Sequence, residues 1–123
     1  MSVILIVEDN EKNMKLARDI LMAKGYQTLE AITGEEGVKL AKEKQPDLVL
    51  MDIQLPGING IEAFRQLRAD PHTAAIPVVA LTASVTPTDR TQISAAGFTA
   101  FLSKPINLKE FVETVRRVLE SGK

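Results

Sequence analysis

The sequence contains no cysteine and only one histidine among its 123 residues. Without cysteine there is neither a disulfide framework nor a thiolate site, which excludes thiol chemistry. No apolar run approaches the roughly 20 residues that span a bilayer. The N-terminal segment MSVILIVEDN has no basic leading region and reaches acidic residues too early for a signal peptide. We therefore expect a cytoplasmic protein that does not enter the membrane.

The chain also lacks a large excess of positive or negative charge. The chain has 15 Lys and Arg against 16 Asp and Glu, a net charge of -1, and the basic residues are scattered. This distribution lacks the electrostatic footprint of direct DNA binding or of an anionic membrane surface. With 45% hydrophobic residues, a chain of this length can build one core without disulfides or structural metal. We expect a single domain over residues 1–123, with no output domain, and a protein or small molecule as partner.

Short apolar runs alternate with stretches of helical periodicity along the whole chain. The runs are rich in Val, Ile and Leu and mostly do not alternate with polar residues, which is typical of strands buried on both faces of a parallel sheet. They lie at Val3 to Val7, Gln27 to Ile32, Leu48 to Met51, Pro77 to Leu81 and Ala100 to Leu102. The order predicts an α/β fold in which helices cover both faces of a parallel sheet.

Local signals mark the beginning of each expected helix. The first two helices and the last two begin at a residue whose side chain can accept from the first-turn amides, and the third helix follows a Gly-rich turn. The expected starts are Asn10, Thr33, Gly60, Thr86 and Asn107.

Polar side chains follow the ends of four of the expected strands. Glu8 and Asp9 follow the first strand, Asp52 the third, Thr82 the fourth and Lys104 the fifth. In open parallel α/β sheets, ligands bind outside the carboxyl ends of the strands. We therefore expect these side chains to converge on one rim of the sheet.

This set of side chains suits a phosphoryl group held on Mg²⁺. Mg²⁺ takes oxygen ligands, so Asp9 and Asp52 could bind it while Glu8 holds a coordinated water. Asp52 could attack phosphorus to give an acyl phosphate, and Lys104 and Thr82 could stabilise the phosphoryl oxygens. Each residue alone also has an ordinary interpretation as a turn residue, helix cap or solvated charge. Their joint placement at separate strand ends favours a site.

Four motifs in this sequence resemble, in order and spacing, the signatures of the receiver domain of two-component response regulators. They are ILIVEDN, LVLMDIQLPGINGIE, VVALTAS and FLSKPI, and the resemblance extends over essentially the full chain. The resemblance implies a flavodoxin-like (βα)5 fold, a doubly wound parallel five-stranded sheet in the order 2-1-3-4-5. The stretches VEDNEKNMKLARDIL and LMDIQLPGINGIE look especially like stand-alone receivers of the DivK type, but similar stretches occur in receivers attached to hybrid kinases.

The resemblance also implies roles by position. Asp52 matches the phospho-acceptor, and Glu8 and Asp9 match the acidic pair that holds Mg²⁺ with it. The backbone carbonyl of Gln54 completes the metal shell in this family. Lys104 matches the lysine that contacts the phosphoryl group.

Further positions match the parts of the family that respond to phosphorylation. Thr82 matches the switch hydroxyl, and Phe101 matches the aromatic residue whose rotamer reports phosphorylation. Gln54 and Ser84 match the variable positions that tune the lifetime of the acyl phosphate.

The implied function is a signalling switch, not an enzyme, because such a protein catalyses only its own phosphorylation and dephosphorylation. It would take its phosphoryl group from a sensor histidine kinase or a histidine phosphotransfer protein and then contact a downstream protein. We expect a monomer or a weak phosphorylation-dependent dimer. Two alternatives stay open: a phosphorylation-independent docking module with the same fold, and a receiver cut from a larger hybrid kinase.

Other chemistries fit less well. A hydrolase of the haloacid dehalogenase type needs a second acid two residues after its nucleophile, where this chain has Gln54. Nucleotide binding would need G-x-x-x-x-G-K-[ST] or G-x-G-x-x-G, and neither occurs. A phosphatase that acts on other molecules would require repeated turnover. His72 lies in a polar segment and is expected to be an exposed loop residue.

Overall fold

The computed structural model of the chain describes residues 2–55, 57–83 and 87–121, with the backbone alone for 87–90. Strands and helices alternate as the sequence predicts. The strands are β1 (Val3–Val7), β2 (Gln27–Ala31), β3 (Leu48–Asp52), β4 (Val78–Thr82) and β5 (Ala100–Ser103). The helices are α1 (Glu11–Ala23), α2 (Gly34–Lys44), α3 (Gly60–Ala69), α4 (Pro87–Ala96) and α5 (Leu108–Ser121). None of these helices is long and apolar enough to cross a membrane.

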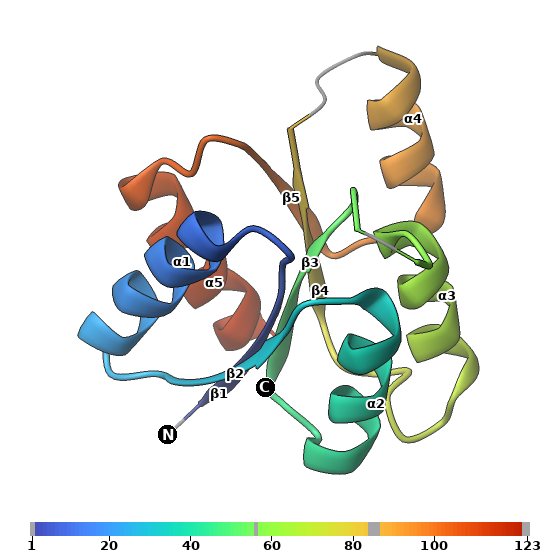
Figure 1. The fold of residues 1–123 in the computed structure, drawn as a ribbon, viewed down its shortest axis with the longest axis horizontal. Helices are drawn as coiled ribbons and strands as arrows, with labels where there is room; N and C mark the ends of the chain where they lie inside the picture. The colour runs from blue at the N-terminus through green and yellow to red at the C-terminus, as the bar shows by residue number, and fades with distance from the viewer. Residues whose placement is uncertain (1, 56, 84–86, 122–123) are drawn as a thin grey trace.

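The five strands form one parallel sheet in the order β2-β1-β3-β4-β5, which confirms the flavodoxin-like expectation. The register brings Asp52 beside Leu81 of β4 and Thr82 beside Ser103 of β5. Because all strands run the same way, their carboxyl ends share one edge of the sheet (Figure 1). The residues that follow β1, β3, β4 and β5 therefore start from the same side of the molecule.

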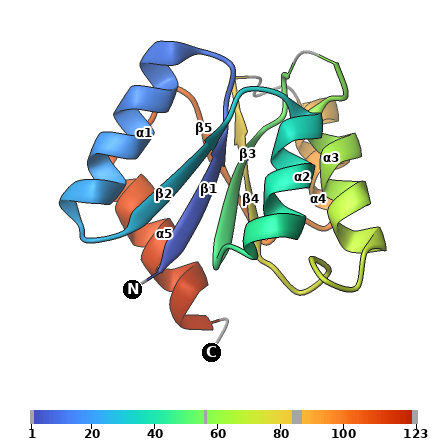
Figure 2. The same cartoon turned by 60° about the horizontal axis from the view of Figure 1, so that its bottom comes forward.

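Two helical layers enclose the sheet. Helices α1 and α5 cover one face, and α2, α3 and α4 lie on the other (Figures 1 and 2). Side chains of β1 alternate between the layers, since Ile4 and Ile6 pack in the cluster with α1 and α5 whereas Leu5 and Val7 pack in the cluster with α2 and α3. Every residue of β3 is buried. The uninterrupted apolar run that precedes Asp52 is thus explained by a central strand with two covered faces.

Side-chain oxygens cap the amino ends of four of the helices. Asn10, Thr33, Asn59 and Asn107 each accept from the amide three positions later, at 3.0, 3.1, 2.9 and 3.0 Å. These contacts satisfy amides that have no partner within the helix. The cap expected for α4, Thr86, lies outside the described residues. These four capping residues therefore determine where their helices begin.

Candidate functional site

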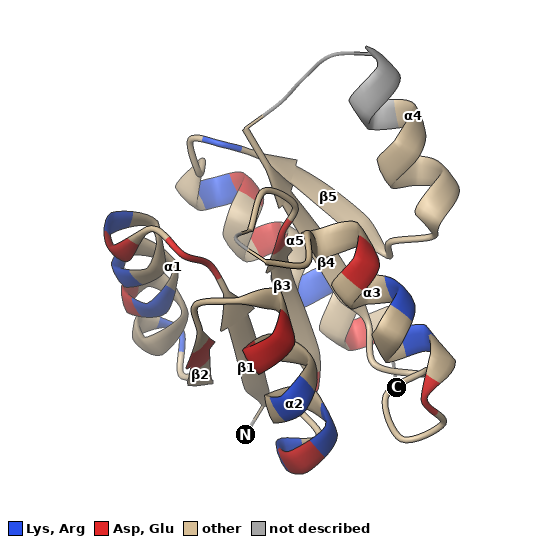
Figure 3. Cartoon of the chain, turned by 45° about the vertical axis from the view of Figure 1, so that its right-hand side comes forward, with Lys and Arg blue, Asp and Glu red and all other residues tan. Residues whose placement is uncertain are grey.

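Three carboxylates meet at the carboxyl edge of the sheet. Glu8 and Asp9 follow β1, where acidic residues lead the chain toward α1 (Figure 3), and Asp52 ends β3. One oxygen from each of the three lies within 4.8 Å of the others. Glu8 and Asp52 are buried, with 1% and 2% of their surfaces exposed, whereas Asp9 is exposed. The structure thus brings two buried acids and one exposed acid together in one cluster.

Lys104 lies between the two buried carboxylates. Its Nζ is 2.6 Å from Oε1 of Glu8 and donates to Oδ2 of Asp52 at 2.9 Å. Its backbone amide donates to the carbonyl of Thr82 at 2.8 Å, which ties the segment after β5 to the end of β4. Burial lowers the pKa of Lys104, but the carboxylates of Glu8 and Asp52 outweigh it and the net pKa is raised. Lys104 therefore stays an ammonium and acts as an internal counter-ion.

Glu8 is the least satisfied member of this group. Its Oε2 accepts from the amide of Asn10 at 3.1 Å. Its Oε1 lies 2.6 Å from the ammonium of Lys104, which Asp52 shares, and has no other hydrogen-bond partner among the described residues. Burial, followed by the contact with Asp52, raises the pKa of Glu8 from 4.5 to about 7, against the opposing effects of Lys104 and the Asn10 amide.

The residues present fit Mg²⁺. All three donors are carboxylates, and hard divalent cations prefer oxygen. Three acids face one lysine, so the cluster carries more negative than positive charge. Oε1 of Glu8 and Oδ2 of Asp52 share the single ammonium of Lys104, and buried charge is costly unless it is fully paired. A small dication at this point would supply the missing positive charge.

The position of Asp52 is set on two sides. Its Oδ1 accepts from the backbone amide of Gln54 at 3.0 Å, and its Oδ2 accepts from Lys104. The buried β3 strand holds its backbone in the sheet. A carboxylate with both oxygens engaged keeps one rotamer, which is the preorganisation that group transfer requires.

The remaining predicted site residues divide into two groups. Thr82 is buried at the end of β4 and lines a pocket of about 270 Å³ together with Gln54. The Gln54 amide donates to Asp52, and the Thr82 carbonyl accepts from the amide of Lys104. Phe101 is 37% exposed and lines a different surface hollow with Asn107 and Glu110 of the β5–α5 region. Ser84 lies outside the described residues. The structure therefore gathers Thr82 and Gln54 at the site and places Phe101 away from it.

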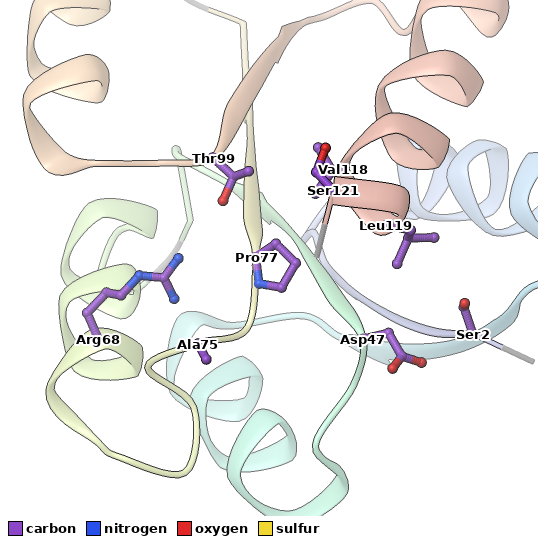
Figure 4. A pocket seen from close by; sticks show the side chains of 9 residues that line it. All are labelled: Ser2, Asp47, Arg68, Ala75, Pro77, Thr99, Val118, Leu119 and Ser121. Carbon is purple, nitrogen blue, oxygen red and sulfur yellow. The ribbon is translucent and has the colours of Figure 1, made fainter. Parts of the chain in front are cut away.

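A second cavity, of about 310 Å³, lies at the opposite edge of the sheet (Figure 4). Its lining includes Asp47 and Pro77, which precede β3 and β4 at their amino ends. The guanidinium of Arg68 in its wall donates to the carbonyl of Ile76 at 2.7 Å and stacks over the ring of Phe64 at 4.6 Å. These contacts are structural, so this cavity is not part of the carboxylate site.

Comparison with known proteins decides the family. The sequence profile described as "Response regulator receiver domain" matches residues 4–116. The chain belongs to the response regulator receiver domain family. It is similar to the polar-differentiation response regulator DivK of Brucella ovis, with 46% identity over 116 residues that cover 94% of each protein. This receiver is thus a phosphorylation-dependent signalling switch of the two-component type, and its DivK-like sequence agrees with the motifs at Asp52 and α1.

Solved structures support the same assignment for this receiver. A response regulator from Chloroflexus aurantiacus matches with a TM-score of 0.92 and 29% identity, over 97% of this chain and 98% of that one. The receiver domain of a sensor histidine kinase from Pseudomonas aeruginosa matches with a TM-score of 0.91 and 32% identity, over the same shares of the two chains. That structure has a magnesium ion coordinated in its active-site cleft. Receiver domains bind Mg²⁺ in an acidic pocket, and this chain has such a pocket.

The raised pKa of Glu8 makes the stability of the metal-free receiver depend on pH. A carboxyl group with a pKa raised by folding stabilises the protein below its unfolded value and loses that contribution as pH rises through the folded value. The free energy of unfolding should therefore fall between about pH 4.5 and about pH 7. The loss should be at most about 3 kcal/mol, at about 1.4 kcal/mol per pKa unit and with screening by water beside Asp9.

Urea unfolding at a series of pH values, monitored by circular dichroism in buffer that contains a metal chelator, measures this pH dependence. Glu8→Gln is the matched control, since the amide keeps the shape and cannot titrate. A difference between wild type and Glu8→Gln that stays constant across this pH range would contradict the prediction.

Proposed function

We propose that this receiver accepts a phosphoryl group on Asp52 from phosphohistidine, with Mg²⁺ held by Glu8, Asp9 and Asp52. The observation that carries the proposal is the arrangement around Asp52: a buried carboxylate at the end of a central strand, with two further acids and one ammonium within reach. A structural ion pair would need only one acid for one lysine. The excess of acid favours a metal-assisted phosphoryl site.

In the proposed reaction, a carboxylate oxygen of Asp52 bonds to phosphorus while the phosphorus–nitrogen bond of phosphohistidine breaks. The imidazole leaves with the electron pair of that bond, and Asp52 becomes an acyl phosphate. Mg²⁺, when bound, offsets the charge on the phosphoryl oxygens. The protein contributes position, because the Gln54 amide and β3 hold the carboxylate before the donor arrives. Catalysis is thus limited to the protein's own phosphorylation and dephosphorylation.

Lys104 and Thr82 would respond to the new phosphoryl group. Lys104 now pairs with Oδ2 of Asp52, and an acyl phosphate replaces that carboxylate charge with phosphoryl oxygens. The ammonium would move its contact to one of these oxygens, and the hydroxyl of Thr82 would donate to another. Movement of Thr82 would leave space behind it for Phe101 to turn inward from its present half-exposed position.

The metal shell and the phosphate lifetime depend on residues near Asp52. The backbone carbonyl of Gln54 would complete the metal shell. The exposed side chain of Gln54, together with Ser84, would set how easily water reaches the acyl phosphate.

The proposed partners follow from the direction of transfer. The donor is a sensor histidine kinase or a histidine phosphotransfer protein, and the output is a contact with a downstream protein. We propose that residues 1–123 act as a single receiver domain, a monomer or a weak phosphorylation-dependent dimer, whose surface changes when Asp52 is phosphorylated. Neither step requires DNA.

Mapping of the phosphorylated residue tests the proposal. The receiver is incubated with a phosphorylated histidine phosphotransfer protein, with and without Mg²⁺, and the product is reduced with borohydride. Reduction of an acyl phosphate converts the aspartate to homoserine, which mass spectrometry should place at position 52 in the Mg²⁺ sample alone. Homoserine at another aspartate, or phosphate on a hydroxyl, would overturn the proposal. If the affinity for a partner does not change with Mg²⁺ or with beryllofluoride, a mimic of the phosphoryl group, a phosphorylation-independent docking module would be favoured.

A further inference from the structure

The β3–α3 loop leads from Asp52 to α3 and carries Gln54. At its far end the amide of Gly60 donates to the carbonyl of Ile53 at 3.0 Å. A methyl group on Gly60 would collide with the carbonyl oxygen of Asp52 and lie 2.8 Å from Cα of Ile53. Gly60 therefore lets the loop close directly onto the backbone of Asp52.

The middle of this loop rests on the first turn of α2. A methyl group on Gly34 would lie 2.7 Å from Cγ1 of Ile58 and 2.8 Å from its carbonyl oxygen. On the neighbouring loop residue, Gly57, a methyl group would lie 2.8 Å from both carboxylate oxygens of Glu35. Two consecutive loop residues thus lie against two consecutive residues of α2. The Glu35 carboxylate can move away from Gly57, but the backbone carbonyl of Ile58 leaves no space for a side chain at Gly34.

Helix α2 is anchored at its first turn and against β1. Its first turn is capped by Thr33, which accepts from the amide of Glu36 at 3.1 Å. One turn later Gly37 lies against β1, where a methyl group would be 2.7 Å from Cγ2 of the buried Val7. Gly34 itself is buried. A methyl group on Gly34 would meet a backbone carbonyl that cannot rotate away, so the loop would have to move.

We propose that Gly34 is a positioning residue for the Mg²⁺ site. The absence of a side chain at Gly34 lets the first turn of α2 fix the β3–α3 loop, and with it the Gln54 carbonyl and the amide that orients Asp52. This inference rests on the proposed function, since Gln54 is a metal ligand only under that proposal. Groups outside the ligand shell commonly alter metal affinity by about 10- to 100-fold.

Gly34→Ala is tested against Lys39→Ala, a substitution at an exposed position of the same helix. Both variants place an alanine in α2 and raise its helix propensity. Only Gly34→Ala should displace the loop. In metal-free NMR spectra it should shift the amide resonances of Gln54 and Gly60, and in a Mg²⁺ titration it should raise the Kd by about tenfold or more. Lys39→Ala, whose side chain is exposed, should leave both loop amides in place.

A Gly34→Ala protein with unshifted loop amides and a Mg²⁺ Kd within about twofold of wild type would overturn the inference. If wild type itself binds no Mg²⁺, the proposed function fails, and the metal-free amide shifts still decide the role of Gly34.

If Gly34→Ala does not fold, Ile58→Ala tests the same contact without added volume, because it removes the side-chain atoms that face Gly34. It should speed hydrogen exchange of the Gly60 amide relative to Leu29→Ala, which truncates another residue packed on the same core cluster. Equal exchange rates in the two variants would also overturn the inference.

Discussion

Asp52→Asn is expected to reduce phosphoryl transfer to the receiver by at least about 10³-fold, because an amide oxygen is a far weaker nucleophile than a carboxylate and cannot form an acyl phosphate. The fold should survive, since asparagine keeps the shape of the side chain and its Oδ1 can still accept from the Gln54 amide. Lys104 would retain Glu8 as a partner. The measurement is acid-labile phosphate on the receiver after reaction with a radiolabelled phosphohistidine donor.

Asp47→Asn is the matched control for this variant. Asp47 precedes β3 just as Asp52 ends it, and its Oδ2 accepts from the amide of Val3 at 2.7 Å, which an amide oxygen can also do. It lies at the other edge of the sheet and should transfer at the wild-type rate. Retained acid-labile phosphate on Asp52→Asn would remove Asp52 as the acceptor.

Lys104→Met is expected to have opposite effects on metal binding and on phosphorylation. In the metal-free protein it leaves Glu8 and Asp52 buried beside each other without a cation. Loss of one partner of a buried ion pair typically costs about 3–5 kcal/mol of stability. The same change removes the charge that competes with Mg²⁺, so the Mg²⁺ Kd should fall. Transfer of the phosphoryl group should nevertheless slow by about 10²-fold or more, since the ammonium no longer contacts the phosphoryl oxygens.

Three measurements separate these effects of Lys104→Met. They are chemical denaturation in a chelator, a Mg²⁺ titration, and single-turnover phosphotransfer at saturating Mg²⁺. Lys109→Met, an exposed lysine on α5, should match wild type in all three. A weaker affinity for Mg²⁺ in Lys104→Met would show that Lys104 supports metal binding and does not compete with it.

Most of the fold could be predicted because its signals are local. The apolar run before Asp52 indicates a strand with two covered faces, and Asn10, Thr33 and Asn107 each cap the helix that the sequence placed after them. The order of the strands in the sheet has no such local signal. Periodicity cannot give this order, and the expectation rested on the resemblance to receivers alone.

The convergence of the acids on one rim was predicted, but their contacts were not. The sequence does not show that Glu8 is buried there or that its Oε1 lies 2.6 Å from Lys104. Sequence reasoning treated the segment around Gly57 and Gly60 as a turn. The close contacts of that turn with Gly34 and with the Asp52 carbonyl depend on the packing of α2 against the loop, which no local pattern encodes. The glycines of PGING, shortly after Asp52, were the one visible signal.

The unequal exposure of the three acids has a kinetic consequence. Asp9 is exposed, while Glu8 and Asp52 are almost fully covered. Under the proposed function, a hydrated cation that approaches from solvent would meet Asp9 before the inner pair. Charges at the rim of a site mainly govern association, and buried partners mainly govern dissociation. We therefore expect Asp9 to change mainly the rate at which the ion binds, and the inner pair mainly the rate at which it leaves.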